Sequence, residues 1–530
     1  MPRNSGDDWL QKYCEHGETV RATFGSVARY EQQRQIFLIP RTQRWLARVS
    51  ADTGFALFLL LFAAVWLAHL FTTSLSPPTD NIEQLIWMQA LEWGYYKHPP
   101  LPTWLFWLFA HVLGANAWTS YAIAAAVNLA SMAILWRLLV HLRGHRYATL
   151  ALFAVLCISY YNARLNSYNH NTVLLLVSSA SAALCWKAFA TRRLRWWIAL
   201  GVVLGLGMLT KYQVAITMTS VGVFWLTQRG WQDAHMRRGL LLAALIALLM
   251  FVPHIQWLRT HDFGPIAYAI ESSLGANFGL AERATDVLNW MADQLLNRAL
   301  AAWLLLAVMV YLQRKEQLHA PLPELRVTSE IRGNAARALL LSWGLVPLVF
   351  MPLVGLASGS RLHLPWGTPF LLFAVPAAME LLGGGVRWAD IPLRRAIAPF
   401  VTIQLLLLTL SYLTSSLGPE NFRRHDWRSF DSGLLRKLIE PPLRDALAGE
   451  AVCVVSGPQA IAGVLALQLS EHPLVLIDGR YDRSPWINTE SVKHCAVLQL
   501  QQNIVLPGGK LLSPMFPGLW WRLVRPKAPG

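Results

Sequence analysis

The chain has 530 residues, of which 54% are apolar and 14% are charged, and it contains 24 tryptophans. This composition excludes an ordinary soluble domain, and the apolar runs that recur through most of the chain predict a membrane protein with several spans. The formal net charge of +16 does not predict nucleic-acid binding, because Lys and Arg cluster between apolar segments, as expected of loops that set membrane orientation.

Residues 1–52 are predicted to form a cytoplasmic leader. The segment is polar and rich in arginine, and it lacks the basic-then-apolar pattern of a cleavable signal peptide.

Residues 53–414 are predicted to form an all-α polytopic membrane bundle. The first span, residues 53–72, is long enough to cross a hydrocarbon core of about 30 Å at about 1.5 Å per residue. Eleven segments fit a membrane span, and some are so short or interrupted that one or two neighbouring spans could be hidden among them. We therefore expect about 11–13 transmembrane helices. The other expected spans are 116–140, 147–163, 172–187, 196–209, 213–227, 239–257, 298–312, 338–354, 367–383 and 397–414.

The charges of the loops predict the orientation of the bundle. The opposite loops carry only one or two basic residues each, so isolated polar groups there indicate a site rather than an orientation signal. With the N-terminus inside and an odd number of spans, the segment after residue 414 is expected outside. The basic clusters assigned to the cytoplasmic side are Arg143/Arg146, Lys187/Arg192/Arg193/Arg195, Arg229/Arg237/Arg238, Arg314/Lys315/Arg326/Arg332/Arg337 and Arg387/Arg394/Arg395.

Residues 415–530 are predicted to form a small extracytoplasmic α/β domain. Apolar runs at 451–456, 473–478 and 495–500 are typical of strands, and 458–469 is typical of a helix. Cys453 and Cys495 each open an apolar strand, so in an oxidising compartment they either pair or remain two buried thiols. The five cysteines of the chain show neither a CxxC pair nor a zinc spacing.

The first outer loop, residues 73–115, is the candidate for chemistry. It places Asp80 and Glu83 just beyond the first span, where charge is costly unless it is used or solvated. Carboxylates three residues apart on a helix reach the same neighbourhood, and one of them could serve as the base for an acceptor hydroxyl. The alternative is a capping box, with Asp80 as N-cap and Glu83 at N3.

A helix is expected to follow at residues 82–93. Its apolar stripe predicts that it lies in the membrane interface, with Trp87 and Trp93 as ordinary interfacial side chains.

Three motifs resemble bacterial glycosyltransferases of the protein O-mannosyltransferase superfamily, a group that includes the lipid A aminoarabinose transferase. They are Gly94-Tyr-Tyr-Lys-His-Pro-Pro-Leu101, Gly205-Leu-Gly-Met-Leu-Thr-Lys211-Tyr and Pro253-His-Ile-Gln-Trp-Leu-Arg-Thr-His261-Asp-Phe. The resemblance covers roughly residues 54–415 and is weak in the tail. It implies a C-type glycosyltransferase fold whose first outer loop carries an aspartate.

The resemblance implies an enzyme of the inner membrane of bacteria that transfers a sugar from a polyprenyl phosphate to an envelope acceptor on the periplasmic face. Lipid A or lipopolysaccharide is a better expectation for the acceptor than protein. A lipid-linked sugar flippase or transporter is the alternative from another class, and a polysaccharide polymerase or ligase is a closer one. The paired broken helices of many transporters are not evident in the sequence.

Roles follow for individual residues. Asp80 and Glu83 are the catalytic candidates, although relatives commonly have adjacent acidic residues where this chain has Asn81. The leaving phosphate needs cations, and Lys211 is the best candidate, ahead of Lys97, His98 and Arg361. The remaining substrate-binding candidates are Tyr95, Tyr96, Asn169, His170, Asn171 and His261.

No obligatory metal is expected, and a divalent cation is left open. Relatives often have an acidic residue where this chain has Lys97, so a carboxylate site would depend on Asp80, Glu83 and a histidine.

Overall fold

The computed structural model describes residues 41–274, 278–317, 330–383 and 386–525. The chain divides into two compact units, residues 1–62 and 63–530, and the boundary falls inside helix α2 (Arg41–Thr72). Every contact given below lies within the second unit. Most of the predicted leader lies outside the described residues, as does Arg326 of the predicted cytoplasmic loops.

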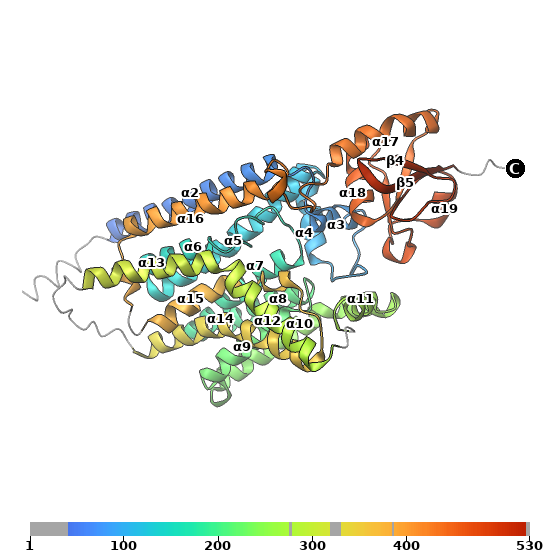
Figure 1. Cartoon of the computed structure of the whole chain (residues 1–530). Coiled ribbons are helices and arrows are strands. Elements are labelled where there is room, and N and C mark those ends of the chain that lie inside the picture. Colours follow the sequence, from blue (N-terminus) through green and yellow to red (C-terminus); the bar gives the residue numbers. More distant parts are fainter. Residues whose placement is uncertain (1–40, 275–277, 318–329, 384–385, 526–530) are drawn as a thin grey trace, which may run out of the picture. The chain divides into compact units, whose positions relative to one another are not determined.

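The second unit contains a bundle of helices that run side by side (Figure 1). Each of the eleven predicted spans overlaps one of its helices or α2. The bounds are α5 (Ala117–Arg143), α6 (His145–Val155), α7 (His170–Thr191), α8 (Leu194–Met208), α9 (Val214–Thr227), α10 (Ala234–Thr260), α13 (Leu300–Gln317), α14 (Glu330–Ser358), α15 (Leu371–Leu382) and α16 (Leu393–Leu413).

Six helices of the described residues are long and apolar enough to cross a membrane. They are α2, α5, α7, α10, α14 and α16. A seventh span arises if the pair Leu280–Arg298 and Leu300–Lys315, bent by 55°, counts as one. The predicted 11–13 spans include shorter helices such as α8, α9 and α15, which lie in the same bundle. The chain is therefore a multi-pass membrane protein.

Short helices lie between the spans, and of these the sequence predicted only the first, as a helix at residues 82–93. The first outer loop contains α3 (Thr79–Trp87) and α4 (Leu101–Leu113), and α11 (Gly264–Ser272) and α12 (Leu280–Ala292) follow α10. The expected span 147–163 is a helix only to Val155, after which turns lead to residue 169.

Glycines let α8 and α10 approach closely. A Cβ atom at Gly201 would lie 2.7 Å from the carbonyl oxygen of Ala243, and one at Gly239 would lie 2.4 Å from the ring of Trp197. Small residues at such contacts let helix backbones pack tightly in membranes. This packing holds the first half of α8 against α10.

A buried ion pair ties α5 to α15. The guanidinium of Arg143 donates to Glu380 at 2.8 and 2.9 Å, and Tyr147 donates to the same carboxylate at 2.9 Å. A charge pair shielded from water is stable only when its remaining hydrogen-bonding groups have partners. The hydrogen bond from Tyr147 supplies one of them.

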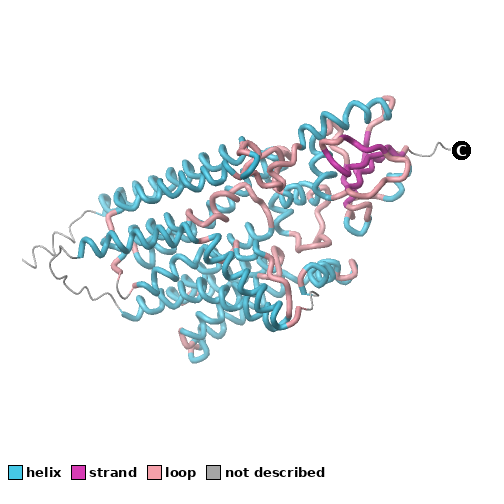
Figure 2. The backbone as a smooth tube through the Cα atoms, in the orientation of Figure 1, coloured by secondary structure: helices cyan, strands magenta, loops and turns pink. Residues whose placement is uncertain are grey.

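The C-terminal part carries a five-stranded sheet, shown in magenta in Figure 2. The strand order is β2-β1-β3-β5-β4; β1 is parallel to β2 and β3, and β5 is antiparallel to β3 and β4. The elements are α17 (Ser432–Leu447), β1 (Val452–Gly457), α18 (Gln459–Gln468), β2 (Leu474–Ile477), α19 (Thr489–Lys493), β3 (Ala496–Gln502), β4 (Lys510–Ser513) and β5 (Phe516–Val524).

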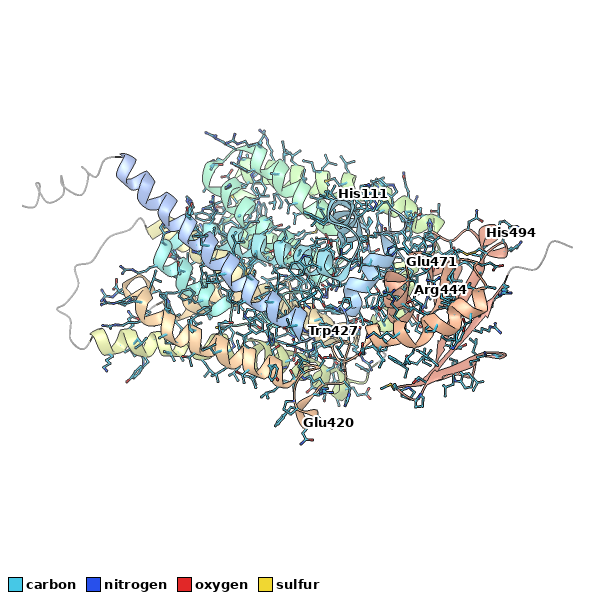
Figure 3. The ribbon with its side chains drawn as sticks, turned by 90° about the horizontal axis from the view of Figure 1, so that it is seen from above. His111, Glu420, Trp427, Arg444, Glu471 and His494 are labelled. Atoms are coloured by element: carbon cyan, nitrogen blue, oxygen red, sulfur yellow. A yellow bond between two sulfur atoms is a disulfide. The ribbon has the colours of Figure 1, made fainter. Side chains whose placement is uncertain are left out.

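The prediction of a helical bundle with a small C-terminal α/β domain is confirmed. The three predicted strands and the helix between the first two are present, while β4 and β5 were missed. The domain boundaries at 52, 414 and 415 stay predictions. Within the domain, Arg444 of α17 pairs with Glu471 after α18, and both are labelled in Figure 3.

The α/β domain packs directly on the first outer loop. Ile82 and Ile86 of α3 share a buried cluster with Ile461 and Leu465 of α18. A Cβ atom at Gly463 would lie 2.5 Å from Ile86 and 2.6 Å from Ile82, so glycine is needed where the two helices touch. The tail therefore positions α3.

Cys453 and Cys495 form a disulfide, with Cα atoms 6.1 Å apart, so of the two interpretations the pairing holds. Because the bond closes a loop of 42 residues in sequence separation, Cys453→Ser should lower the free energy of unfolding by about 2–4 kcal/mol. The measurement is thermal unfolding of the purified protein with and without reductant. Equal melting temperatures for wild type and variant under non-reducing conditions would contradict the prediction.

Candidate functional site

Asp80 lies in the first turn of α3. The N-cap of this helix is Pro78, and no side chain caps it, so the capping-box interpretation of Asp80 and Glu83 is wrong. The Asp80 side chain is exposed and carries its negative charge near the positive end of the helix dipole. Asp80 is thus free of a capping role.

Asn169 connects Asp80 to α7. Its Oδ1 caps α7 by accepting from the backbone of Asn171 at 2.9 Å and Thr172 at 3.1 Å, while its Nδ2 donates to Asp80 Oδ2 at 2.8 Å. One amide therefore begins a helix and orients the carboxylate.

Asn81 anchors the start of α3 inside the protein and is 0% exposed. Its amide nitrogen donates to Ser120 Oγ at 2.9 Å and to the carbonyl of Asn166 at 2.8 Å, and its Oδ1 accepts from the backbone of Tyr168 at 2.8 Å. An ionised carboxylate could not make the two donor bonds, which explains why an amide fits this position.

Lys211 occupies the short connection between α8 and α9 and is 8% exposed. Its ammonium donates to Asn171 Oδ1 at 2.7 Å and lies 5.5 Å from the ring centroid of Trp366. It forms no ion pair with a carboxylate of the described residues. Burial lowers the pKa of Lys211 to about 7, against the opposing charge of Asp80.

Glu83 and Lys97 form an ion pair at 2.5 Å. Gln459 of α18 bridges it, donating to Glu83 at 3.1 Å and accepting from Lys97 at 3.2 Å and from Tyr96 at 2.9 Å. Burial raises the pKa of Glu83, and Lys97 opposes that rise. Burial is the largest single influence on Lys97 and lowers its pKa, but the charge and hydrogen bond of Glu83, together with Tyr96 and Tyr268, outweigh burial and raise the pKa.

The rings of His98 and His170 contact each other beside these groups, with centroids 4.1 Å apart and planes tilted by 44°. Burial lowers the pKa of His98 well below its ordinary value, and the charges of His170, Lys211 and Lys97 lower it further. At neutral pH, His98 is therefore a neutral hydrogen-bonding group and contributes no positive charge.

Tyr95 and Trp87 are buried beneath the first outer loop. Their rings stack at 4.8 Å, and the Tyr95 hydroxyl donates to the carbonyl of Ala90 at 2.7 Å. The expected interfacial helix 82–93 is wrong, because α3 ends at Trp87 and buries every residue from Asn81 to Trp87. Of the two tryptophans, Trp93 is exposed, at 45%.

Arg361 and His261 make no described contact with Asp80, Lys211 or Glu83. Arg361 lies over the Phe278 ring at 5.6 Å, and His261 stacks on Trp257 at 4.2 Å. The structure thus brings together Asp80, Asn169, Asn171 and Lys211, with Glu83, Lys97, His98, His170 and Tyr96 close by. The functional roles of all twelve predicted residues stay predictions.

The sequence analysis assigned no role to four side chains of this region. Gln459, Trp366 and Tyr268 contact Lys97 or Lys211. Arg164 lines a narrow cavity of about 20 Å³ together with Asn169, and its charge interacts with Asp80. A lone arginine in an otherwise uncharged loop is a signal that could have identified Arg164, whereas Gln459 lies in a distant segment that carries no motif.

A carboxylate metal site does not fit these residues. Among the described residues there is no group of three or more His, Cys, Asp or Glu side chains that could hold a metal ion. Glu83 is already bound to Lys97. Independence from metal stays a prediction.

Breaking the Glu83–Lys97 pair should destabilise the fold. Glu83→Gln leaves the buried ammonium of Lys97 uncompensated and should cost about 3 kcal/mol, while adding Lys97→Met should restore most of the loss. Thermal unfolding of both single variants and of the double variant measures the coupling. Additive losses would mean that the pair contributes little to stability.

Part of the sequence is similar to known glycosyltransferases. Residues 97–257 match the family model described as dolichyl-phosphate-mannose-protein mannosyltransferase. The lipopolysaccharide core galacturonosyltransferase RgtA of Rhizobium johnstonii is 25% identical over 227 residues. The match covers 41% of this chain and 43% of RgtA, so it spans less than half of that relative.

The structural comparison covers most of the chain. The crystal structure of ArnT from Cupriavidus metallidurans bound to undecaprenyl phosphate gives a TM-score of 0.59 at 14% identity, and the apo structure gives 0.55 at 15%. Each comparison covers 89% of this chain and 98% of ArnT. The expected resemblance is confirmed: residues 97–257 are similar to the mannosyltransferase family, and the chain has the C-type glycosyltransferase fold seen in ArnT.

Proposed function

We infer that this protein is an integral membrane glycosyltransferase that moves a sugar from a polyprenyl phosphate to a lipid A or lipopolysaccharide acceptor on the periplasmic face of the inner membrane. One observation carries the inference: an exposed carboxylate, Asp80, and a buried cation, Lys211, are held by neighbouring amides of α7. The transfer reaction needs these two charges at one site.

The leaving group explains the need for Lys211. When the bond between the sugar C1 and the phosphate oxygen breaks, negative charge develops on the phosphate. Lys211 has no carboxylate partner among the described residues, so its charge remains available to that phosphate. Binding of the anion favours the protonated amine, which burial alone disfavours.

Asp80 acts on the acceptor. Its Oδ2 accepts from Asn169, which orients the carboxylate and leaves Oδ1 to take the proton of an attacking hydroxyl. If the acceptor is a phosphate group that is already anionic, no base is needed, and Asp80 then supports the positive charge that develops on the sugar.

The relatives support the choice of donor and acceptor. ArnT has been crystallised with undecaprenyl phosphate, and RgtA is named for transfer of galacturonic acid to the lipopolysaccharide core. We extend a polyprenyl-phosphate donor and an envelope-lipid acceptor from these proteins to this chain. Glu83 and Lys97 would serve the site by positioning the loop between α3 and α4.

Transfer can be distinguished from flipping with a labelled polyprenyl-phosphate sugar and lipopolysaccharide in proteoliposomes. The proposal expects label on the acceptor only when the protein is present. Label that crosses the bilayer still attached to the polyprenyl lipid would support a flippase and contradict the proposal. Label that grows into a polymer would indicate a polymerase.

Asp80→Asn should lower the transfer rate about 10²–10⁴-fold if the acceptor is a hydroxyl, because the base is lost while the shape is kept. A smaller loss is expected if the acceptor is a phosphate. Single-turnover transfer by protein that inserts and melts as wild type does is the measurement. An unchanged rate would exclude Asp80 from both roles.

Lys211 should make donor use depend on pH. An amine with a pKa lowered to about 7 is charged below that pH and loses its charge above it, so kcat/KM for the donor should fall as pH rises beyond about 7. Lys211→Gln should lower kcat/KM by about 10²–10³-fold and remove this fall. Lys211→Arg is the matched control and should move the fall to higher pH. The same fall in the Gln variant would assign it to another group.

A further inference from the structure

A second, larger cavity lies at the other end of the helices that carry the site. Its volume is about 540 Å³, and it is formed where α5 and α7 end and α8 begins. The walls are mostly apolar, with Leu138 and Leu184 among them, while Lys187, Arg195, Arg137 and His141 bring basic groups to it. An apolar hollow with several basic groups is suited to an amphiphile with an anionic head.

This cavity is separate from the candidate active site. Asn169 and Asn171 lie at the first turn of α7, whereas Lys187 lies in its last turns. Since α7 has 22 residues, its two ends are about 33 Å apart. The basic end is the one predicted to face the cytoplasm, at the depth where phospholipid head groups lie.

The positive charges of Lys187 and Arg195 are held in place by an aromatic ring. The Lys187 ammonium lies 4.6 Å and the Arg195 guanidinium 4.9 Å from the ring centroid of Trp196. Neither forms an ion pair with a carboxylate of the described residues, and no Asp or Glu lines the cavity. Stacking on an indole leaves the outer face of each cation able to bind an anion.

Two indole groups add unused hydrogen-bond donors. The Nε1 atoms of Trp186 and Trp196 are buried without a partner among the described residues, and both side chains line the cavity. A buried donor without an acceptor costs free energy, which a small side-chain shift toward a bound phosphate oxygen would recover.

We propose that the cavity between α5, α7 and α8 is a binding site for an anionic glycerophospholipid. The phosphate lies against Lys187 and Arg195 beside Trp196, and an acyl chain follows the apolar wall that Leu184 helps to form. The membrane supplies this ligand at high local concentration on the side where the basic loops are predicted to lie. The proposal does not depend on the sugar-transfer activity.

Native mass spectrometry of the detergent-purified full chain tests the site. Phosphatidylglycerol should remain bound, whereas phosphatidylcholine with the same acyl chains should not. At about 1 kcal/mol per basic residue, Lys187→Gln or Arg195→Gln should weaken phosphatidylglycerol binding about fivefold, and the double variant about 25-fold. Sugar transfer at saturating donor should stay at the wild-type rate in the double variant.

Arg193→Gln is the matched control, because Arg193 is an exposed neighbour that does not line the cavity. It should bind phosphatidylglycerol as wild type does. Equal retention by the double variant and wild type would overturn the proposal, as would equal loss in the Arg193 control. Displacement of phosphatidylglycerol by inorganic phosphate alone would reduce the site to a simple anion site. Preferred binding of undecaprenyl phosphate, lost in the double variant, would instead assign the cavity to the polyprenyl lipid.

Discussion

The hydrogen bond from Asn169 to Asp80 is the contact on which the site depends. It joins the first turn of α3 to the first turn of α7, while the neighbouring Asn171 holds Lys211. Asn81 ties α3 to the loop before α7 through two buried hydrogen bonds and to Ser120 of α5 through a third. Amides suit this task because each can donate and accept, so they align two opposite charges without neutralising either.

The C-terminal α/β domain takes part in the site. Gln459 at the start of α18 bridges Glu83 and Lys97, and Gly463 one turn later lets α18 rest against Ile82 and Ile86. An ion pair removed from water is stable only when its remaining hydrogen-bond donors and acceptors have partners. The domain supplies such a partner in Gln459. Movement of this domain would therefore change the geometry of the first outer loop.

The two ends of α7 carry different chemistry. At one end, Asp80 and Lys211 are each oriented by a specific amide. At the other end, Lys187 and Arg195 lie over the ring of Trp196 and pair with no carboxylate in the part of the chain that the structure describes. The basic residues from which the sequence predicts the cytoplasmic side therefore include those for which we propose lipid binding.

The sequence by itself determined the helical bundle, because each span needs its own uninterrupted apolar run. It proposed Asp80 and Lys211 as site candidates, because single charges beside such runs stand out and the motifs of this chain resemble a known family. It also predicted the strands at 451–456, 473–478 and 495–500. Only the tertiary structure decided that Glu83 pairs with Lys97 rather than capping α3, that Trp87 is buried, and that Gln459 completes the network. These outcomes depend on contacts between residues up to 376 positions apart, and local periodicity and spacing carry no information about them.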